Sequence, residues 1–201
     1  MKTVLAIAFC FVAGLANAQE VGLDLPSLFS VSGVASDDTL NIRSEPNASA
    51  AIIGELAHDE TRVEVVARSS NGRWGLVNTD EQSGWASLRF LEEQPFQQFP
   101  PSAFSCFGTE PFWYSGTIGS MTEWSAIGED PVTIPTGWVG GSMMQDRFGL
   151  RALGPSTALT MVVRKSLCSD GMSDRLYGLE VDLVVDGFDT QFYSGCCSLS
   201  N

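Results

Sequence analysis

The chain has 201 residues, and its 24 acidic side chains outnumber its 11 basic ones, which gives a formal net charge of −13. This balance argues against nucleic acid as a partner, because phosphates need clustered lysines and arginines. It also argues against attraction to anionic lipid surfaces. Residues 19–95 carry a net charge of −8 and residues 96–201 a net charge of −6. Because the acidic charge is spread over both halves, we interpret it as a surface that keeps the protein soluble. The alternative is that it attracts a basic protein partner.

The first residues have the pattern of an export signal. Lys2 supplies a positive start, residues 4–14 form an apolar run, and residues 16–18 have the small-x-small form of a signal peptidase site. The run is shorter than the ~20 apolar residues that a spanning helix needs. We therefore assign residues 1–18 to a signal peptide that is cleaved after Ala18. We expect a periplasmic or secreted protein with no membrane span in the mature chain.

Short β-rich segments separated by turn residues dominate the remainder of the chain. The apolar residues between 56 and 66 lie in one such region. The turn at residues 69–73 precedes a strand at 74–77, and a second turn at 78–84 leads to a strand at 85–88. Residues 94–103 are rich in Pro and Gln and read as a linker, since proline cannot donate ladder hydrogen bonds.

Strand patterns resume in the second half of the chain. Residues 161–167 and 179–185 alternate in the manner of strands, and Asp186-Gly187 predicts a hairpin turn into a strand at 188–193. Residues 116–141 are rich in Gly, Thr and Trp and are harder to divide. We predict an all-β protein with two small β barrels.

Four cysteines follow the signal peptide, all in the second half: Cys106, Cys168, Cys196 and Cys197. In an oxidising compartment an even set predicts two disulfides, with three possible pairings. Neighbouring residues of a strand point to opposite faces, so the adjacent pair is expected to bridge different partners. We expect no metal and no cofactor, because paired C-x2-C spacing is missing and His58 is the only histidine.

Residues 38–47 (DTLNIRSEPN) resemble the L-N-[VI]-R-x-x-P signature that opens bacterial SH3 domains. Four further segments resemble later strands of that family in the same order: residues 53–56, 63–66, 73–77 and 84–86. The resemblance covers roughly residues 32–93 and implies an SH3-like barrel. It also implies binding rather than chemistry, because these domains commonly bind peptidoglycan peptides or other proteins.

Three residues of this half are candidate ligand contacts. Trp74 and Trp85 are large amphipathic rings that suit either a core or a binding anchor. For Trp74 we favour partial exposure, because SH3-like folds hold extended peptides on strand-edge aromatics. Arg43 suits either a local structural pairing or a ligand contact. His58 lies where the family has a turn, and we expect it to be exposed rather than catalytic.

Residues 106–113 (CFGTEPFW) resemble the C-x-G-x-E-P-F-W opening of an uncharacterised family of exported bacterial domains. The later blocks CSDGMSD (168–174) and GCC (195–197) resemble further motifs of that family. The resemblance covers about residues 104–198, so we place a disulfide-bearing β domain at 104–201. It implies no activity.

Within this half, Glu110, Trp113, Asp174 and Arg175 are candidate ligand contacts. Together with Asp170, the two acids among them could also do acid–base work. We favour a hydrogen-bonded turn near a disulfide for the 170–175 cluster, and a core position for Trp113.

These patterns predict a non-catalytic exported binding or scaffold protein of the cell envelope. Its expected partner is peptidoglycan or an envelope protein. Catalysis of the Cys/His or zinc type is not expected, since one histidine cannot furnish it. Two alternatives stay open: an inhibitor of a basic wall-degrading enzyme such as lysozyme, and a carboxylate-based enzyme in the second half.

Overall fold

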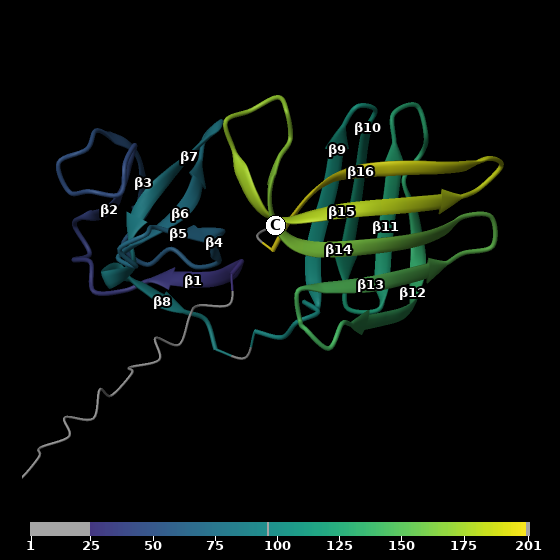
Figure 1. Ribbon diagram of the computed structural model, residues 1–201, viewed down its shortest axis with the longest axis horizontal. Helices are drawn as coiled ribbons and strands as arrows, with labels where there is room; N and C mark the ends of the chain where they lie inside the picture. The colour runs from purple at the N-terminus through teal and green to yellow at the C-terminus, as the bar shows by residue number, and fades with distance from the viewer. Residues whose placement is uncertain (1–24, 96, 200–201) are drawn as a thin grey trace, which may run out of the picture.

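The computed structural model describes residues 25–95 and 97–199, so the proposed signal peptide lies outside the described residues. These residues form two all-β lobes that lie side by side (Figure 1). The sequence prediction of an SH3-like half followed by a disulfide-bearing barrel is confirmed. In the described part of the chain no helix has the length and apolarity that crossing a bilayer requires.

Two small sheets build the first lobe. The order β4-β1-β8 makes a three-stranded sheet, and β3-β2-β7-β6-β5 makes a five-stranded one. The strands are β1 (Ser27–Val31), β2 (Thr39–Arg43), β3 (Ile52–Ala57), β4 (Val63–Val65), β5 (Ala67–Arg68), β6 (Trp74–Thr79), β7 (Gln82–Ser87) and β8 (Leu91–Glu93), and the 3-10 helix η1 (Leu88–Phe90) joins β7 to β8. Leu40 and Ile42 alternate with polar residues along β2, so that one face of the strand enters a shared core.

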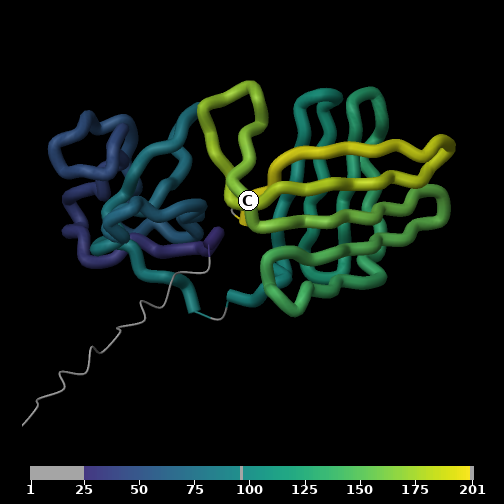
Figure 2. Tube along the Cα trace, viewed as in Figure 1, coloured from purple at the N-terminus to yellow at the C-terminus, as the bar shows by residue number. Residues whose placement is uncertain are grey.

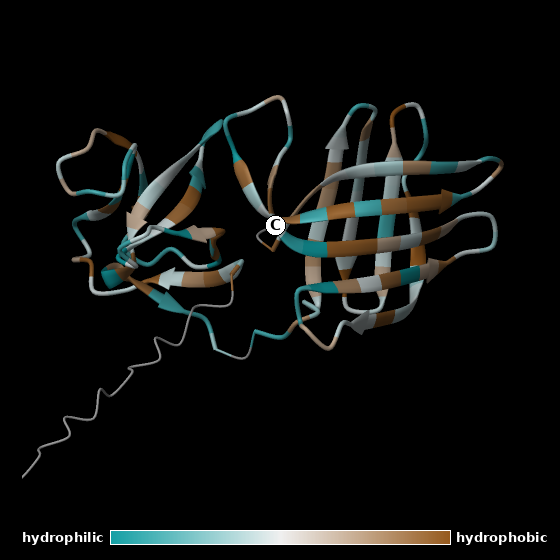
Figure 3. Ribbon diagram, viewed as in Figure 1, coloured by the Kyte–Doolittle hydropathy of each residue, from teal (hydrophilic) through white to brown (hydrophobic). Residues whose placement is uncertain are grey.

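The second lobe is a closed eight-stranded barrel in which each strand pairs with the next and β16 returns to β9. Its strands are β9 (Ala103–Thr109), β10 (Phe112–Ile118), β11 (Met121–Ala126), β12 (Val132–Gly141), β13 (Arg147–Leu153), β14 (Ala158–Ser169), β15 (Leu176–Asp186) and β16 (Thr190–Ser198). Apolar and polar residues alternate along β15 (Figure 3), with Val181 and Leu183 facing inward. Closure removes the exposed sheet edges that would otherwise pair with other chains.

Large side chains fill the barrel rather than lining an open cavity. Phe104, Phe148 and Met161 are among its fully buried residues, and the ring of Phe104 meets that of Phe148 edge to face at 5.2 Å. Eight strands enclose a space just wide enough for such filling. The middle of the barrel, where a lipocalin-like cavity would lie, is therefore occupied by the protein's own core.

Some turns differ from the sequence prediction. β6 ends at Thr79 and β7 begins at Gln82, so the turn that we expected at residues 78–84 is much shorter. The expected strand at residues 188–193 begins only at Thr190, which leaves Phe188 exposed in the turn. In both cases ladder pairing to the neighbouring strand, rather than the turn residues, sets the strand ends.

Two disulfides join three strands at the seam where the barrel closes. Cys106 on β9 bonds Cys197 on β16, its direct partner in the ladder. Cys196, on the opposite face of β16, bonds Cys168 near the end of β14. The prediction that the adjacent cysteines bridge different partners is confirmed, and the bonds are consistent with an extracytoplasmic location.

A loop of the barrel docks on the first lobe. Residues 170–175, between β14 and β15, reach the β6–β7 hairpin (Figure 2). There the backbone N–H of Asp174 donates to the carbonyl of Glu81 at 2.9 Å, and the N–H of Ser83 donates to the carbonyl of Asp174 at 3.1 Å. Just beyond the loop, Asn78 donates its amide to the carbonyl of Leu176 at 3.0 Å. The two lobes thus share a short parallel bridge and are not merely tethered.

The predicted linker also packs against both lobes. Gln97 accepts a hydrogen bond from the backbone N–H of Leu28 at 2.6 Å and donates one to its carbonyl at 2.8 Å, in the manner of a further strand beside β1. Phe99 meets the ring of Phe148 edge to face at 5.3 Å. These contacts restrain how the lobes move relative to one another.

Removing the disulfide between Cys106 and Cys197 is expected to destabilise the protein more than removing the other one. The first closes a sequence separation of 91 residues and the second one of 28. Loop-closure entropy then gives about 4–5 kcal/mol for the first and about 3–4 kcal/mol for the second. Urea unfolding of the two double-alanine variants measures both values, and the reverse order would contradict this account.

Replacing Asn78 by alanine is expected to loosen the docked loop, because its amide bonds the backbone of Leu176 through both its donor and its acceptor. The backbone amides of Asp174 and Leu176 should then exchange with solvent roughly tenfold faster, the effect of about 1.4 kcal/mol of lost hydrogen bonding. Asn47→Ala is the matched control, since the hydrogen bonds of Asn47 stay within its own loop. Equal exchange in both variants would exclude Asn78 as a docking residue.

Candidate functional site

A groove of about 390 Å³ lies on the first lobe, between the segment that leads into β2 and the end of β7 with η1. It contains two of the arginines of this half, Arg43 and Arg89, and the aromatic rings of Trp74 and Phe90. Its lining is completed by small, polar and aliphatic residues, namely Gly33, Val34, Ala35, Asp38, Thr39, Leu40, Asn41, Ala48 and Ser87. The sequence had pointed to Arg43 and Trp74, and the fold brings these two residues together.

Trp74 is held at the first position of β6 by the turn before it. Its backbone N–H donates to the hydroxyl of Ser69 at 3.1 Å, and its carbonyl accepts from the N–H of Ser69 at 2.9 Å. The turn itself closes on Asn71, which accepts the Ser69 hydroxyl hydrogen at 2.8 Å. The indole is half-buried, so a fixed backbone presents a partly exposed ring to the groove.

Arg43 makes the local structural pairing that the sequence left open, and it also lines the groove. It stands at the end of β2, where the pairing with β3 shifts register, and it donates to the carbonyl of Ala50 at 2.7 Å. That bond ties the 44–51 loop to the sheet. The side chain also lines the groove, where a bound carboxylate could use the donors of its guanidinium that the carbonyl leaves.

The groove lining carries two arginines and one carboxylate, within a strongly acidic protein. Arg43 and Arg89 face one carboxylate in the lining, that of Asp38, which accepts the backbone N–H of Thr39 at 2.8 Å. The guanidinium of Arg89 lies 5.4 Å from the centre of the Phe90 ring. Stacking of this kind leaves the edge donors of the guanidinium for a ligand. A ligand that carries carboxylates and an apolar surface is the chemical match.

Trp85 lies beside the groove rather than in its lining. On β7 it pairs with Arg43 on one side and with Leu76 on the other, so its side chain shares a sheet face with Arg43. It is half-buried. Three ligand contacts were expected in this half. Arg43 and Trp74 line the groove, whereas Trp85 lies on the strand next to Arg43 and outside the lining.

The four candidates of the second half do not form one pocket. Glu110 is exposed in the turn between β9 and β10, whereas Trp113 is buried in the barrel core and stacks on Trp124 with ring centres 5.7 Å apart. Asp174 and Arg175 belong to the docked loop. Arg175 contacts the first lobe through the backbone carbonyl of Asp80 and through Glu81, whose carboxylate is 3.6 Å from its guanidinium.

Asp170 closes the docked loop instead of facing a cleft. Its carboxylate accepts the backbone N–H groups of Met172 at 2.9 Å and Ser173 at 2.8 Å, and the Ser173 hydroxyl at 2.8 Å. Burial raises the pKa of this carboxyl, but the hydrogen bonds to Ser173 and Met172 outweigh that effect, and the pKa lies below its usual value. This is a hydrogen-bonded turn next to a disulfide, as the sequence predicts.

A second cavity, of about 450 Å³, opens at the barrel end that faces away from the first lobe. The inner rings of Trp124 and Tyr193 form its floor, and Glu129 and Asp189 stand at its rim. Burial, and then the nearby charge of Glu129, raise the pKa of Tyr193. Trp124 is only 2% exposed, so little of the aromatic floor can be reached.

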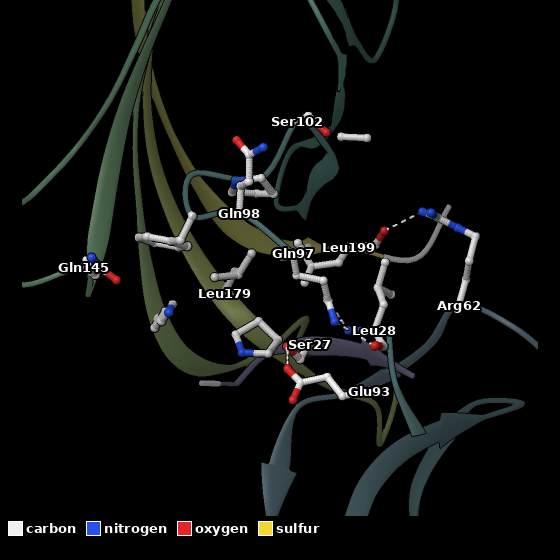
Figure 4. A pocket seen from close by; sticks show the side chains of 15 residues that line it. Ser27, Leu28, Arg62, Glu93, Gln97, Gln98, Ser102, Gln145, Leu179 and Leu199 are labelled. Carbon is white, nitrogen blue, oxygen red and sulfur yellow. Dashed lines mark hydrogen bonds between the residues drawn. The ribbon is translucent and has the colours of Figure 1, made fainter. Parts of the chain in front are cut away.

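A third cavity, of about 320 Å³, lies between the lobes where the linker passes (Figure 4). Ser27 donates to Glu93 at 2.8 Å on one wall, and Arg62 donates to the carbonyl of Leu199 at 2.8 Å on another. Gln97 bonds the backbone of Leu28 across its middle. The bond from Arg62 joins the two lobes, and the other two tie β8 and the linker to β1, so the cavity belongs to the junction.

Sequence reasoning missed Arg89, Phe90, Asn41 and Asp38 as groove residues. Arg89 and Phe90 sit in η1, directly after the last strand that the pattern identified. Asp38 and Asn41 lie within residues 38–47, the first segment that resembles an SH3 domain. The alternation of polar and apolar residues along a strand does not show which polar side chains line a groove. The charge of Arg89 beside an aromatic residue was the one available signal.

Comparison with known families supports the first lobe as a binding module. Residues 38–92 match the family model described as bacterial SH3 domain, which suggests a cell-wall or peptidoglycan binding module and a non-catalytic role. No curated protein and no solved structure matches the chain. The matched segment contains β2 to β7, η1 and most of the groove lining, but not β1 or the barrel.

The lowered pKa of Asp170 predicts a pH-dependent loop. A carboxyl whose pKa is depressed by folding stabilises the fold fully above its unfolded value, near 3.8, and loses this effect as the pH falls through the folded value. The amide nitrogen shifts of Met172 and Ser173 should therefore titrate with a midpoint below 3.8. The Asp170→Asn variant should lack this titration, and a midpoint at or above 3.8 would contradict the hydrogen-bond account.

Proposed function

We propose that this protein is an exported binding or scaffold protein of the cell envelope whose first lobe holds peptidoglycan stem peptides in the groove. One observation carries the proposal: two guanidiniums and a partly exposed indole line a concavity in an otherwise acidic protein. Stem peptides are short and carry several carboxylates. Arginine recognises carboxylates through paired hydrogen bonds, and the indole offers a rigid apolar surface.

The proposed export rests on the leader pattern of residues 1–18 and on the two disulfides. A cell-envelope location also suits the family match of residues 38–92. The match to a binding domain, together with a groove that holds arginines and aromatics rather than a nucleophile and its base, supports binding instead of catalysis.

A basic protein partner is the second candidate, and the far end of the barrel favours it. The loops at residues 126–132 and 186–190 carry Glu129, Asp130, Asp186 and Asp189 and include no basic residue. Phe188, which lies between Asp186 and Asp189 in the second of these loops, is fully exposed. An acidic rim around an exposed ring suits a basic wall-degrading enzyme such as lysozyme, which the protein would inhibit. Full lysozyme activity in a stoichiometric excess of the protein would eliminate this candidate.

The groove proposal predicts that Trp74→Ala and Arg89→Gln each weaken binding of a soluble stem peptide roughly tenfold or more, because aromatic and arginine anchors dominate such interfaces. Retention on purified peptidoglycan should fall in parallel, and added salt should weaken it further by screening the guanidiniums. Titration calorimetry with the peptide and a pull-down on the wall material measure the two effects.

Arg73→Gln is the matched control for the charge change. Arg73 is exposed on the same lobe and does not line the groove. It should bind the stem peptide as the unaltered protein does. Equal loss of affinity in Arg73→Gln and Arg89→Gln would mean that net charge, and not the groove, governs binding. No retention of the unaltered protein at low salt would count against the proposal as a whole.

A further inference from the structure

An exposed tryptophan lies flat on the outer face of the barrel. Trp138, on β12, is 56% exposed. An added Cβ on Gly140 would come within 2.3 Å of its Cζ2 atom, and one on Gly149 would come within 2.9 Å of its Cζ3 atom. The six-membered ring therefore rests on the backbone of both residues, which face each other across β12 and β13.

The two glycines are what allow this position. Any side chain at residue 140 or 149 would push the ring off the sheet, because both added atoms would overlap it. With one ring face against the backbone, the opposite face is turned to solvent. A ring fixed in this way loses little conformational freedom when something stacks on it.

One basic and one apolar side chain lie on strand positions next to the ring. Arg151, which is exposed, is the direct ladder partner of Trp138 on β13. On β14, Val162 pairs with Gly149 and is 45% exposed, which extends the flat apolar surface by one small side chain. The surface thus combines a planar ring, a neighbouring aliphatic side chain and an exposed arginine as the ring's ladder partner.

We propose that Trp138 and Arg151 form a binding platform for a glycan whose pyranose rings carry carboxylates. The C–H groups on one face of a pyranose carry a small positive charge and fit the electron-rich face of an indole. The guanidinium of Arg151 provides the donors for a carboxylate on the same or the next sugar. The platform is flat, so it suits a sugar ring better than a side chain that needs an enclosing pocket.

This inference deepens the proposed function and rests on it for the choice of glycan. A wall polymer offers both chemistries: stem peptides for the groove on the first lobe, and a sugar strand for the barrel. Where the peptides have been removed, each acidic sugar of that strand exposes a free carboxylate. Two sites of modest affinity on docked lobes would together hold the polymer more tightly than either does alone.

The test uses the intact two-lobed protein and peptide-free glycan strands prepared from peptidoglycan with an amidase. We expect Trp138→Ala and Arg151→Gln each to weaken binding about fivefold to tenfold, the size of an aromatic or charge-assisted contact. Trp138→Phe should retain most of the affinity, because a smaller ring still rests on the glycines. Strands whose carboxylates have been reduced to alcohols should bind the unaltered protein and Arg151→Gln equally. Titration calorimetry measures each affinity.

Trp74→Ala is the control that separates the two sites. It should bind the peptide-free glycan normally and lose the stem peptide. Glycan binding that is absent in the unaltered protein, or equal in Trp138→Ala, would overturn the platform and leave the groove untouched. Normal stem-peptide binding by Trp74→Ala would overturn the groove and leave the platform standing. Concentration-dependent dimerisation that Trp138→Ala abolishes would assign this face to a second copy of the chain and overturn the sugar proposal.

Discussion

The pairing of β16 with β9 is the constraint on which the remainder of the structure depends. It closes the barrel, and the bond between Cys106 and Cys197 fixes it covalently. Without this seam the eight strands would expose two edges and a core of large rings. The second bond, from Cys196 to Cys168, ties the same strand to the base of the docked loop. One end of the barrel therefore has a fixed shape that can be presented to the first lobe.

That fixed end makes the two lobes a unit. The carboxylate of Asp170 accepts hydrogen bonds within the loop, and the backbone of Asp174 bonds the β6–β7 hairpin. The side-chain amide of Asn78 donates to the carbonyl of Leu176. The residues that line the groove take no part in these contacts. A small SH3-like core is marginal by itself, and here it gains support from a barrel that leaves the groove uncovered.

The two proposed sites use the same physical combination in different shapes. Trp74 and Arg89 line the concave groove, whereas Trp138 and Arg151 are ladder partners on the outer face of the barrel. In each case a rigid aromatic ring would provide an apolar contact, and a guanidinium would provide directional hydrogen bonds to a carboxylate. The difference in shape is the reason why we propose an extended peptide for one and a sugar ring for the other. The acidic remainder of the surface would repel other polyanions, such as nucleic acids, and so increase the specificity of both sites.

The sequence by itself determined the class of fold and the bridging of adjacent cysteines to different partners, because alternation, turn residues and strand geometry are local properties. The SH3-like first half followed from the resemblance of residues 32–93 to a known family. It also singled out Arg43 and Trp74. Only the tertiary structure decided that Arg89 joins them, that Asp174 and Arg175 face the other lobe, and that Trp138 lies on two glycines. These features depend on which strands become neighbours, and barrel closure brings together residues that are far apart in the chain. No local pattern records such pairings.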